Sequence, residues 1–90
     1  MFKTLENLIS TIRQKKTSPD EKSYTSKLLR DKNLSVEKVK EEIAELIEAV
    51  ENNSNTVHEA ADVLYHLLVY LEGNGVRIED IMLELDKRRK

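Results

Sequence analysis

Two short acidic motifs are the residues of this sequence best suited to chemistry. Glu42 and Glu45 form one pair, Glu59 and Asp62 form the other, and the members of each pair are three positions apart. Residues three apart are surface neighbours on a helix, so each pair would place two carboxylates on adjacent turns of one side. Carboxylate oxygens are hard ligands that suit Mg²⁺ or Mn²⁺. The spacing therefore suggests a divalent-cation site, although either motif alone is more often only surface charge.

Both motifs lie in segments with the periodicity of amphipathic helices, from Val36 to Val50 and from Val57 to Leu71. Apolar stripes recur at steps of three and four residues and are expected to face the core. They are Val36, Val39, Ile43, Leu46, Ile47 and Val50 in the first segment, and Val57, Ala60, Ala61, Leu64, Leu67, Leu68 and Leu71 in the second. The polar turn at 52–55 is short, which predicts antiparallel neighbours and brings the two acidic pairs together.

The acids of the second segment are expected to face protein rather than water. Glu59 and Asp62 lie opposite the apolar stripe, with His66, on a side that also carries Val63 and Tyr70. A helix that is apolar almost all round is usually buried on more than one side. Ionised carboxylates held out of water need cations or basic partners.

Four acids in one site suggest a specific reaction. Divalent ions bound there can polarise a phosphoryl oxygen and lower the pKa of a water, which suits hydrolysis of a phosphoanhydride. His66 could be a metal ligand or a proton carrier, but a half-buried structural role is the preferred interpretation. His58 is expected to be exposed. The sequence contains no Ser/His/Asp set, glycine-rich phosphate loop or HExxH motif to support another hydrolytic mechanism.

The remaining elements are also helical. Helices are predicted from Phe2 to Lys15, with Thr4 as a possible cap, from Asp20 to Arg30, and over a last segment that begins at Ile78. The second of these would have Ser18 as its cap and Pro19 in its first position, and Ser35 would cap the helix that follows. The Gly73-Asn74-Gly75 run is a stop signal. We therefore expect one all-α domain over residues 1–90, an antiparallel helical bundle of about four to five helices, completed by homodimerisation because so small a domain buries limited surface.

The amino-acid composition limits the kinds of binding partner that we expect. There is no cysteine, so neither a disulfide framework nor a thiolate metal site is available. The net charge of −2 does not suggest a nucleic-acid partner. No apolar run approaches the ~20 residues of a membrane span, so no membrane partner is expected and a cytoplasmic location is predicted.

The second predicted helix carries hydroxyls and cations that could serve a nucleotide. Ser23, Tyr24, Thr25 and Lys27 could bind phosphate or ribose, since lysine acts as a point charge and hydroxyls can donate to phosphate oxygens. They could equally form an exposed polar face, and chemistry alone favours that interpretation.

Three runs of the sequence closely resemble the phosphoribosyl-ATP pyrophosphohydrolase family, within the all-α nucleotide pyrophosphohydrolase (MazG-like) superfamily. They are SPDEKSYTSKLL at residues 18–29, KVKEEIAE at 38–45 and EAADVLYHLLV at 59–69. The superfamily shares only ExxE followed by ExxD, and the SYT-x-KLL run separates this family from the rest. The resemblance extends over nearly the whole chain.

The resemblance implies Mg²⁺-dependent cleavage of phosphoribosyl-ATP between its α and β phosphates, the second step of histidine biosynthesis, by a homodimer. Matched by position, the implied metal ligands are Glu42, Glu45, Glu59 and Asp62, with Mn²⁺ as a possible substitute ion. Glu41 is implied as a supporting or water-orienting acid beside Glu42 and Glu45. The residues implied to lie near the nucleotide substrate are Ser23, Tyr24, Thr25 and Lys27.

One position departs from the family pattern, and two other functions remain open. Lys40 stands where relatives commonly have glycine, and lysine is the better helix former. A house-cleaning pyrophosphohydrolase acting on nucleoside triphosphates would use the same metal chemistry. A non-catalytic helical dimerisation module would carry the acids only as surface charge, and would show no saturable binding of magnesium.

Overall fold

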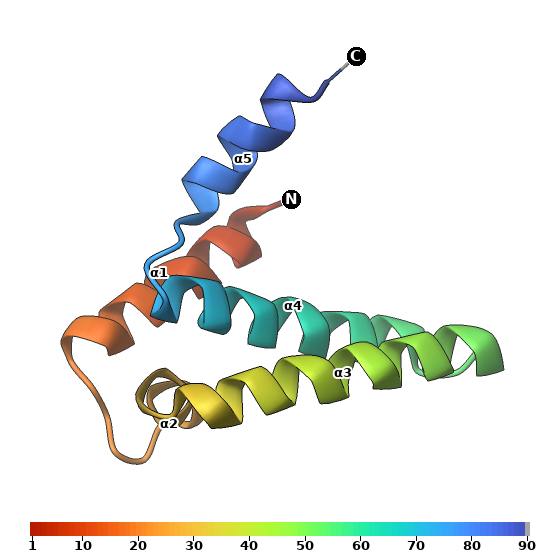
Figure 1. Ribbon diagram of the computed structural model, residues 1–90, viewed down its shortest axis with the longest axis horizontal. Coiled ribbons are helices and arrows are strands. Elements are labelled where there is room, and N and C mark those ends of the chain that lie inside the picture. Colours follow the sequence, from red (N-terminus) through yellow and green to blue (C-terminus); the bar gives the residue numbers. More distant parts are fainter. Residues whose placement is uncertain (90) are drawn as a thin grey trace.

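The computed structural model describes residues 1–89, which form five helices and no strand (Figure 1). The helices are α1 (Lys3–Thr17), α2 (Tyr24–Arg30), α3 (Lys32–Asn52), α4 (Thr56–Gly73) and α5 (Ile78–Lys87). The all-α class expected from the sequence is confirmed. None of these helices combines the length and the apolar character that crossing a bilayer requires.

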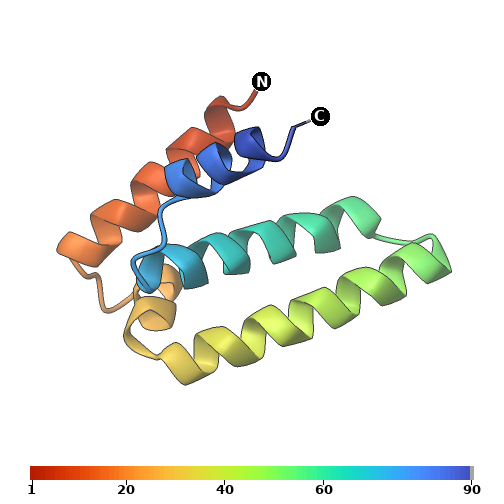
Figure 2. The ribbon, with the colours of Figure 1, turned by 45° about the horizontal axis from the view of Figure 1, so that its top comes forward.

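The two longest helices, α3 and α4, lie side by side and antiparallel, as the short polar turn predicts (Figures 1 and 2). Asn53 and Asn55 both adopt left-handed backbone conformations, with φ of 53° at each. Asparagine tolerates this region better than most residues, which lets three residues reverse the chain. The turn therefore aligns the two acidic motifs across one seam. Lys40 lies exposed within an unbroken α3.

The start of α2 is later than the sequence indicates. Ser23, not Ser18, is its cap, because the Ser23 side chain accepts a hydrogen bond from the backbone N–H of Ser26 at 3.2 Å. Asp20 instead closes a turn in which its Oδ1 accepts from the N–H of Lys22 at 3.0 Å. This local bond competes with helix formation, so the prediction of a helix beginning with Pro19 and Asp20 is wrong.

Two other predicted caps are also wrong. Asp31 caps α3 by accepting from the N–H of Leu34 at 3.0 Å, whereas Ser35 is buried within the helix. Helix α1 begins at Lys3, so Thr4 lies inside it, and Phe2 at the cap position makes no side-chain bond. The stop after Gly73 is confirmed, since Gly75 has a φ of 77° that L side chains rarely adopt.

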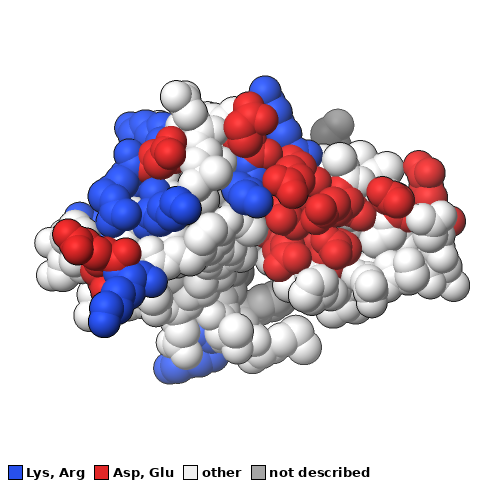
Figure 3. Space-filling view, turned by 90° about the horizontal axis from the view of Figure 1, so that it is seen from below, with Lys and Arg blue, Asp and Glu red and all other residues white. Residues whose placement is uncertain are grey.

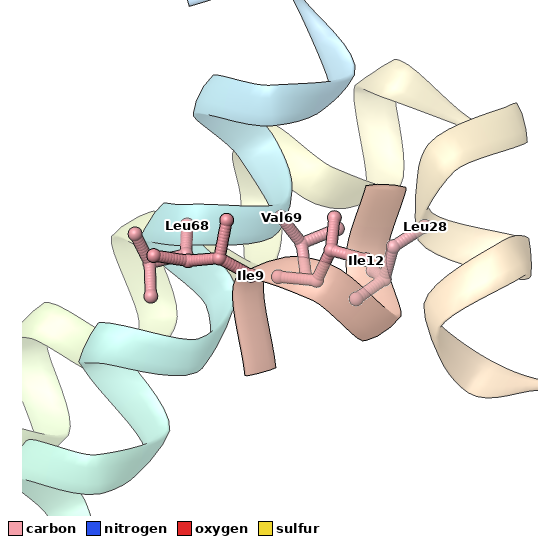
Figure 4. Packing of buried hydrophobic residues seen from close by; sticks show 5 residues of the cluster. All are labelled: Ile9, Ile12, Leu28, Leu68 and Val69. Atoms are coloured by element: carbon pink, nitrogen blue, oxygen red, sulfur yellow. The ribbon is translucent and has the colours of Figure 1, made fainter. Parts of the chain in front are cut away.

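The core joins α1, α2 and α4 near one end of the molecule. Its buried apolar side chains are Ile9, Ile12, Leu28, Leu68 and Val69 (Figure 4). Burying each large aliphatic side chain contributes about 1.5 to 3 kcal/mol. All of the α4 members lie in the second half of that helix, so the core anchors only this half.

The first half of α4 and the second half of α3 carry solvent-exposed apolar side chains, and we call this part of the structure the arm. Val57 is 85% exposed, Leu64 55%, Ile47 55% and Val50 58%. Within this chain the two apolar stripes do not reach the core in the arm, because the buried cluster takes only Leu68 and Val69 from α4. The expectation that the acidic side of α4 faces protein is confirmed, since Glu59 and Asp62 are both partly buried.

Arg13, on α1, links α5 to the rest of the fold through ion pairs. Its guanidinium donates to both carboxylate oxygens of Glu72 at 3.0 and 2.9 Å, and also to Glu79 at 2.9 and 2.6 Å. Glu72 is only 3% exposed, and the paired guanidinium holds its pKa below the usual range. Beyond this link α5 extends away from the α3–α4 pair (Figure 1) and exposes Met82, Leu83 and Leu85.

Candidate metal and nucleotide site

The α3–α4 seam brings the two acidic motifs together. Ligand oxygens of Glu42, Glu45 and Glu59 all lie within 4.8 Å of one another, and so do ligand atoms of His58, Glu59 and Asp62. Glu59 belongs to both groups and connects them. The prediction that the four acids approach one another is therefore confirmed, and His58 is exposed as expected.

Two carboxylate oxygens in this seam are buried without compensation. The Oε2 atoms of Glu42 and Glu59 have no hydrogen-bond partner among the described residues. Glu42 is 9% exposed although it carries a carboxylate. Buried acceptors are normally satisfied, so two orphaned oxygens at one point indicate a place for a bound cation. The donor set, oxygen only apart from His58, fits Mg²⁺ or Mn²⁺.

The electrostatics of these acids agree with that interpretation. Burial raises the pKa of the Glu42 carboxyl, and the neighbouring Glu45 and Asp62 carboxylates raise it further. Burial and the Glu45 charge likewise raise the pKa of Glu59. Like charges disfavour each other's ionised forms, so the seam in its metal-free state resists full ionisation.

Glu41 lies apart from the four clustered acids. It is exposed, and its carboxylate pairs with the ammonium of Lys38 at 3.3 Å. That hydrogen bond raises the pKa of Lys38. The Tyr24 hydroxyl lies beside the seam, 3.0 Å from Nε2 of His66, one turn of α4 beyond Asp62.

Helix α2 docks on α4 through two consecutive hydroxyl contacts. The Tyr24 hydroxyl lies 3.0 Å from Nε2 of His66, and the Thr25 hydroxyl is hydrogen-bonded to the Tyr65 hydroxyl. The Tyr24 and Tyr65 rings stack with centroids 6.2 Å apart. Tyr24 and Thr25 are therefore held at the seam by residues that follow Asp62 by one turn of α4.

The other two proposed substrate residues have different settings. The Ser23 hydroxyl oxygen is committed to capping α2. Lys27 is exposed and forms no ion pair with the described residues, so its ammonium is available to an anion.

Charge is segregated over the face drawn in Figure 3. Asp and Glu gather over the arm, and Lys and Arg gather toward the opposite end of the long axis. A cavity of about 270 Å³ opens next to the acids near the α3–α4 turn, lined by Glu45, Glu48, Ala49, Asn52, Ser54, Asn55 and Glu59. A second cavity, of about 210 Å³, is lined by Lys15, Lys16, Pro19, Ser26, Leu29, Arg30 and Gly73. Lys16 there donates to the carbonyl of Glu72 at 2.6 Å and so completes the end of α4.

Sequence reasoning missed two members of the site, Lys38 and Tyr65, and did not predict which residue His66 contacts. By pattern Lys38 is one more charge on a charged helix, yet its ammonium lies 3.3 Å from the carboxylate of Glu41. Tyr65 and His66 lie about 40 residues from the α2 residues they hold, a separation that no local spacing reveals. Only the docking of α2 on α4 brings these pairs together.

Fold and site together define an all-α protein with a carboxylate-lined seam suited to divalent cations. A family model described as phosphoribosyl-ATP pyrophosphohydrolase matches residues 5–89. A phosphoribosyl-ATP pyrophosphatase of Methanoregula boonei is 41% identical over 99% of this chain and 90% of its own length. One of Halobacterium salinarum is 38% identical over 99% of this chain and 100% of its own length. The chain belongs to the phosphoribosyl-ATP pyrophosphohydrolase family.

Some relatives are longer proteins. The chloroplastic histidine biosynthesis bifunctional protein hisIE of Arabidopsis thaliana is 42% identical over 94% of this chain. The chain spans only 32% of that relative, and 41% of a bifunctional relative from Pyrococcus furiosus. The matched unit therefore also occurs as part of larger chains.

Replacing Glu42 by glutamine should stabilise the metal-free protein against unfolding and abolish the further stabilisation by Mg²⁺. A carboxyl with a raised pKa contributes stability that is present below the unfolded-state pKa and is lost as the pH rises through the folded-state pKa. At pH 8 the variant should thus gain about 1 kcal/mol in free energy of unfolding. Wild type should gain about 2.7 kcal/mol from Mg²⁺ at a hundredfold excess over its dissociation constant.

Denaturant unfolding with and without Mg²⁺ measures both effects. Glu51→Gln, an exposed acid on the same helix, is the matched control and should behave as wild type. Equal stabilisation of wild type and Glu42→Gln by Mg²⁺ would show that the ion binds elsewhere.

Proposed function

We propose that this protein hydrolyses the α–β phosphoanhydride of phosphoribosyl-ATP to phosphoribosyl-AMP and pyrophosphate, the second step of histidine biosynthesis. The observation that carries the proposal is the carboxylate seam with its two buried, unpaired oxygens, on Glu42 and Glu59. Family membership supports the choice of substrate, since relatives that match nearly all of this chain are named for this activity.

The cofactor in this proposal is Mg²⁺, with Mn²⁺ as a possible substitute. The residues that would hold it are Glu42, Glu45, Glu59 and Asp62. When bound, the ion offsets the charge of the carboxylates and phosphates and makes a water easier to deprotonate. Without that positive charge, the same acids would repel a polyphosphate.

The catalytic group comprises Glu41, Glu42 and Glu45. Glu41 is exposed, and in this proposal its carboxylate would orient the attacking water and accept its proton. Lys38 holds this carboxylate at 3.3 Å, which limits its motion. Lys38 also supplies a positive charge on a helix otherwise rich in acids.

The substrate residues of the proposal lie at the start of α2, which packs against both α3 and α4. Tyr24 and Thr25 are fixed by their contacts with α4. Lys27 offers an exposed ammonium to phosphate, and Ser23 contributes by holding the first turn in place. In this proposal the hydroxyls and the Lys27 ammonium would contact one side of the nucleotide and the acids would lie on the other.

We also propose that the protein is a homodimer whose interface includes the arm of α3 and α4. Contiguous exposed apolar surface on a small protein marks an interaction site. The arm exposes Ile43, Ile47, Val50, Val57 and Leu64. A second copy packed on these side chains would complete the bundle beside the acidic seam. The cytoplasmic location and the lack of nucleic-acid or membrane partners stay predictions from the sequence.

A pyrophosphate-release assay tests the proposed activity. Wild type should release pyrophosphate from phosphoribosyl-ATP with Mg²⁺ and not after chelation. Glu45→Gln should lower kcat on the order of 100-fold, because a carboxylate that stabilises charge in the transition state is lost. Glu51→Gln should retain the wild-type rate.

The same assay separates the other functions. Faster turnover of ordinary nucleoside triphosphates would replace the proposal with a house-cleaning pyrophosphohydrolase. No turnover of either substrate, together with no saturable Mg²⁺ binding, would leave a helical dimerisation module.

Sedimentation equilibrium tests the dimer. Wild type should have twice the mass of the chain, and Ile47→Lys should dissociate it by placing a charge in the apolar interface. Glu37→Lys, which introduces the same residue at an exposed position in the first half of α3, outside the arm, should remain dimeric. A wild type that sediments as a monomer at micromolar concentration would refute this part of the proposal.

A further inference from the structure

His66 is a buried polar residue that the proposed chemistry does not use. It is 7% exposed and lies in the α4 turn that follows Asp62. Its Nδ1 lies 2.8 Å from the backbone carbonyl oxygen of Asp62, and its Nε2 lies 3.0 Å from the hydroxyl of Tyr24. Both ring nitrogens are therefore engaged, one by a proposed metal-ligand residue and one by a proposed substrate residue.

The backbone carbonyl of Asp62 determines which ring nitrogen of His66 carries the hydrogen. A backbone carbonyl oxygen can only accept a hydrogen bond, so Nδ1 of His66 must carry the hydrogen. In a neutral imidazole the other nitrogen then has a lone pair and accepts. The Tyr24 O–H must consequently donate to Nε2, and the hydroxyl hydrogen points away from any ligand in the seam.

Packing holds this orientation in place. The His66 ring meets Tyr24 edge-on with centroids 5.7 Å apart, and meets Tyr65 edge-on at 5.0 Å. The neighbouring bond between Thr25 and Tyr65 keeps the first turn of α2 against α4. Rotation of the phenolic hydroxyl would leave Nε2 of a buried ring without its partner, which is costly.

The lone pairs of the Tyr24 oxygen remain available. Tyr24 is 44% exposed, so a ligand can reach its hydroxyl oxygen. Burial raises the pKa of that phenol, so the hydrogen stays on the oxygen at neutral pH. A hydroxyl that already donates can still accept a hydrogen bond from a ligand. Ionised phosphate oxygens are acceptors only and cannot be that ligand group.

We propose that His66 is a positioning residue that presents the Tyr24 hydroxyl to the nucleotide as a hydrogen-bond acceptor for a ribose hydroxyl. Tyr24 then selects for a sugar hydroxyl and does not bind phosphate. The identity of the nucleotide rests on the proposed function, whereas the direction of the hydrogen bond rests on the contacts of His66 and on a neutral imidazole ring.

Nitrogen NMR of the ¹⁵N-labelled, substrate-free protein tests the direction of the bond at pH 8. His66 should be the tautomer with hydrogen on Nδ1. Tyr24→Phe should shift the Nε2 resonance of His66 and leave exposed His58 unchanged. A hydrogen on Nε2 of His66, or on both of its nitrogens, would overturn the proposal. This measurement needs no substrate, so it stands apart from any failure of the proposed function.

Kinetics with phosphoribosyl-ATP test the role. Loss of one neutral hydrogen bond to bound substrate should raise KM about fivefold in Tyr24→Phe and leave kcat nearly unchanged. The asparagine in His66→Asn keeps a donor for the Asp62 carbonyl but loses the acceptor for Tyr24, so this variant should match Tyr24→Phe. The longer amide in His66→Gln can still accept from Tyr24 and should restore a KM near the wild-type value.

The double variant separates positioning from stability. Tyr24→Phe with His66→Asn should be no worse than either change alone, because both remove the same bond. Equal losses in His66→Gln and His66→Asn would indicate a purely structural histidine. A fall in kcat with unchanged KM in Tyr24→Phe would mean that the phenol acts on the reacting groups, and would also overturn the proposal.

Discussion

Repulsion between carboxylates in the α3–α4 seam is the constraint on which the rest of the structure depends. Three helical carboxylates come within 4.8 Å of one another, and oxygens of Glu42 and Glu59 are buried without partners among the described residues. Such an arrangement opposes folding unless protons or cations compensate it. If a divalent cation provides that compensation, as we propose, the feature that weakens the metal-free fold also binds the cofactor and, with it, the phosphates.

The fold separates the part that provides stability from the part that carries the acids. The apolar core and the pairing of Arg13 with Glu72 lie toward one end, where α1, α2 and the second half of α4 meet. The acidic seam lies on the arm beyond that core. Helix α2 connects the two, since Leu28 packs in the core while Tyr24 and Thr25 reach α4 near the acids. The apolar side chains that this division leaves exposed on the arm form the interface of the homodimer that we propose.

Local patterns in the sequence predicted the helices and the approach of the acidic pairs, because helical periodicity and a short turn are local signals. These predictions failed where a tertiary contact, or a competing local hydrogen bond, determines where a helix begins or which side chain is buried. Asp20 accepts a hydrogen bond from the N–H of Lys22 in a local turn, so α2 begins only at Tyr24. Val57 and Leu64 follow the core stripe in spacing but lie beyond the reach of α1. The contact of Tyr24 with His66 joins residues 42 apart and leaves no pattern in either segment.

The most direct test of a cation in the seam is anomalous diffraction from crystals grown with Mn²⁺. We expect an anomalous peak in the seam, at bonding distance from carboxylates of both α3 and α4, with Glu42, Glu45, Glu59 and Asp62 as the candidate ligands. A well-ordered seam with no peak at saturating Mn²⁺, or a peak bound only by other residues, would contradict the proposed cation site.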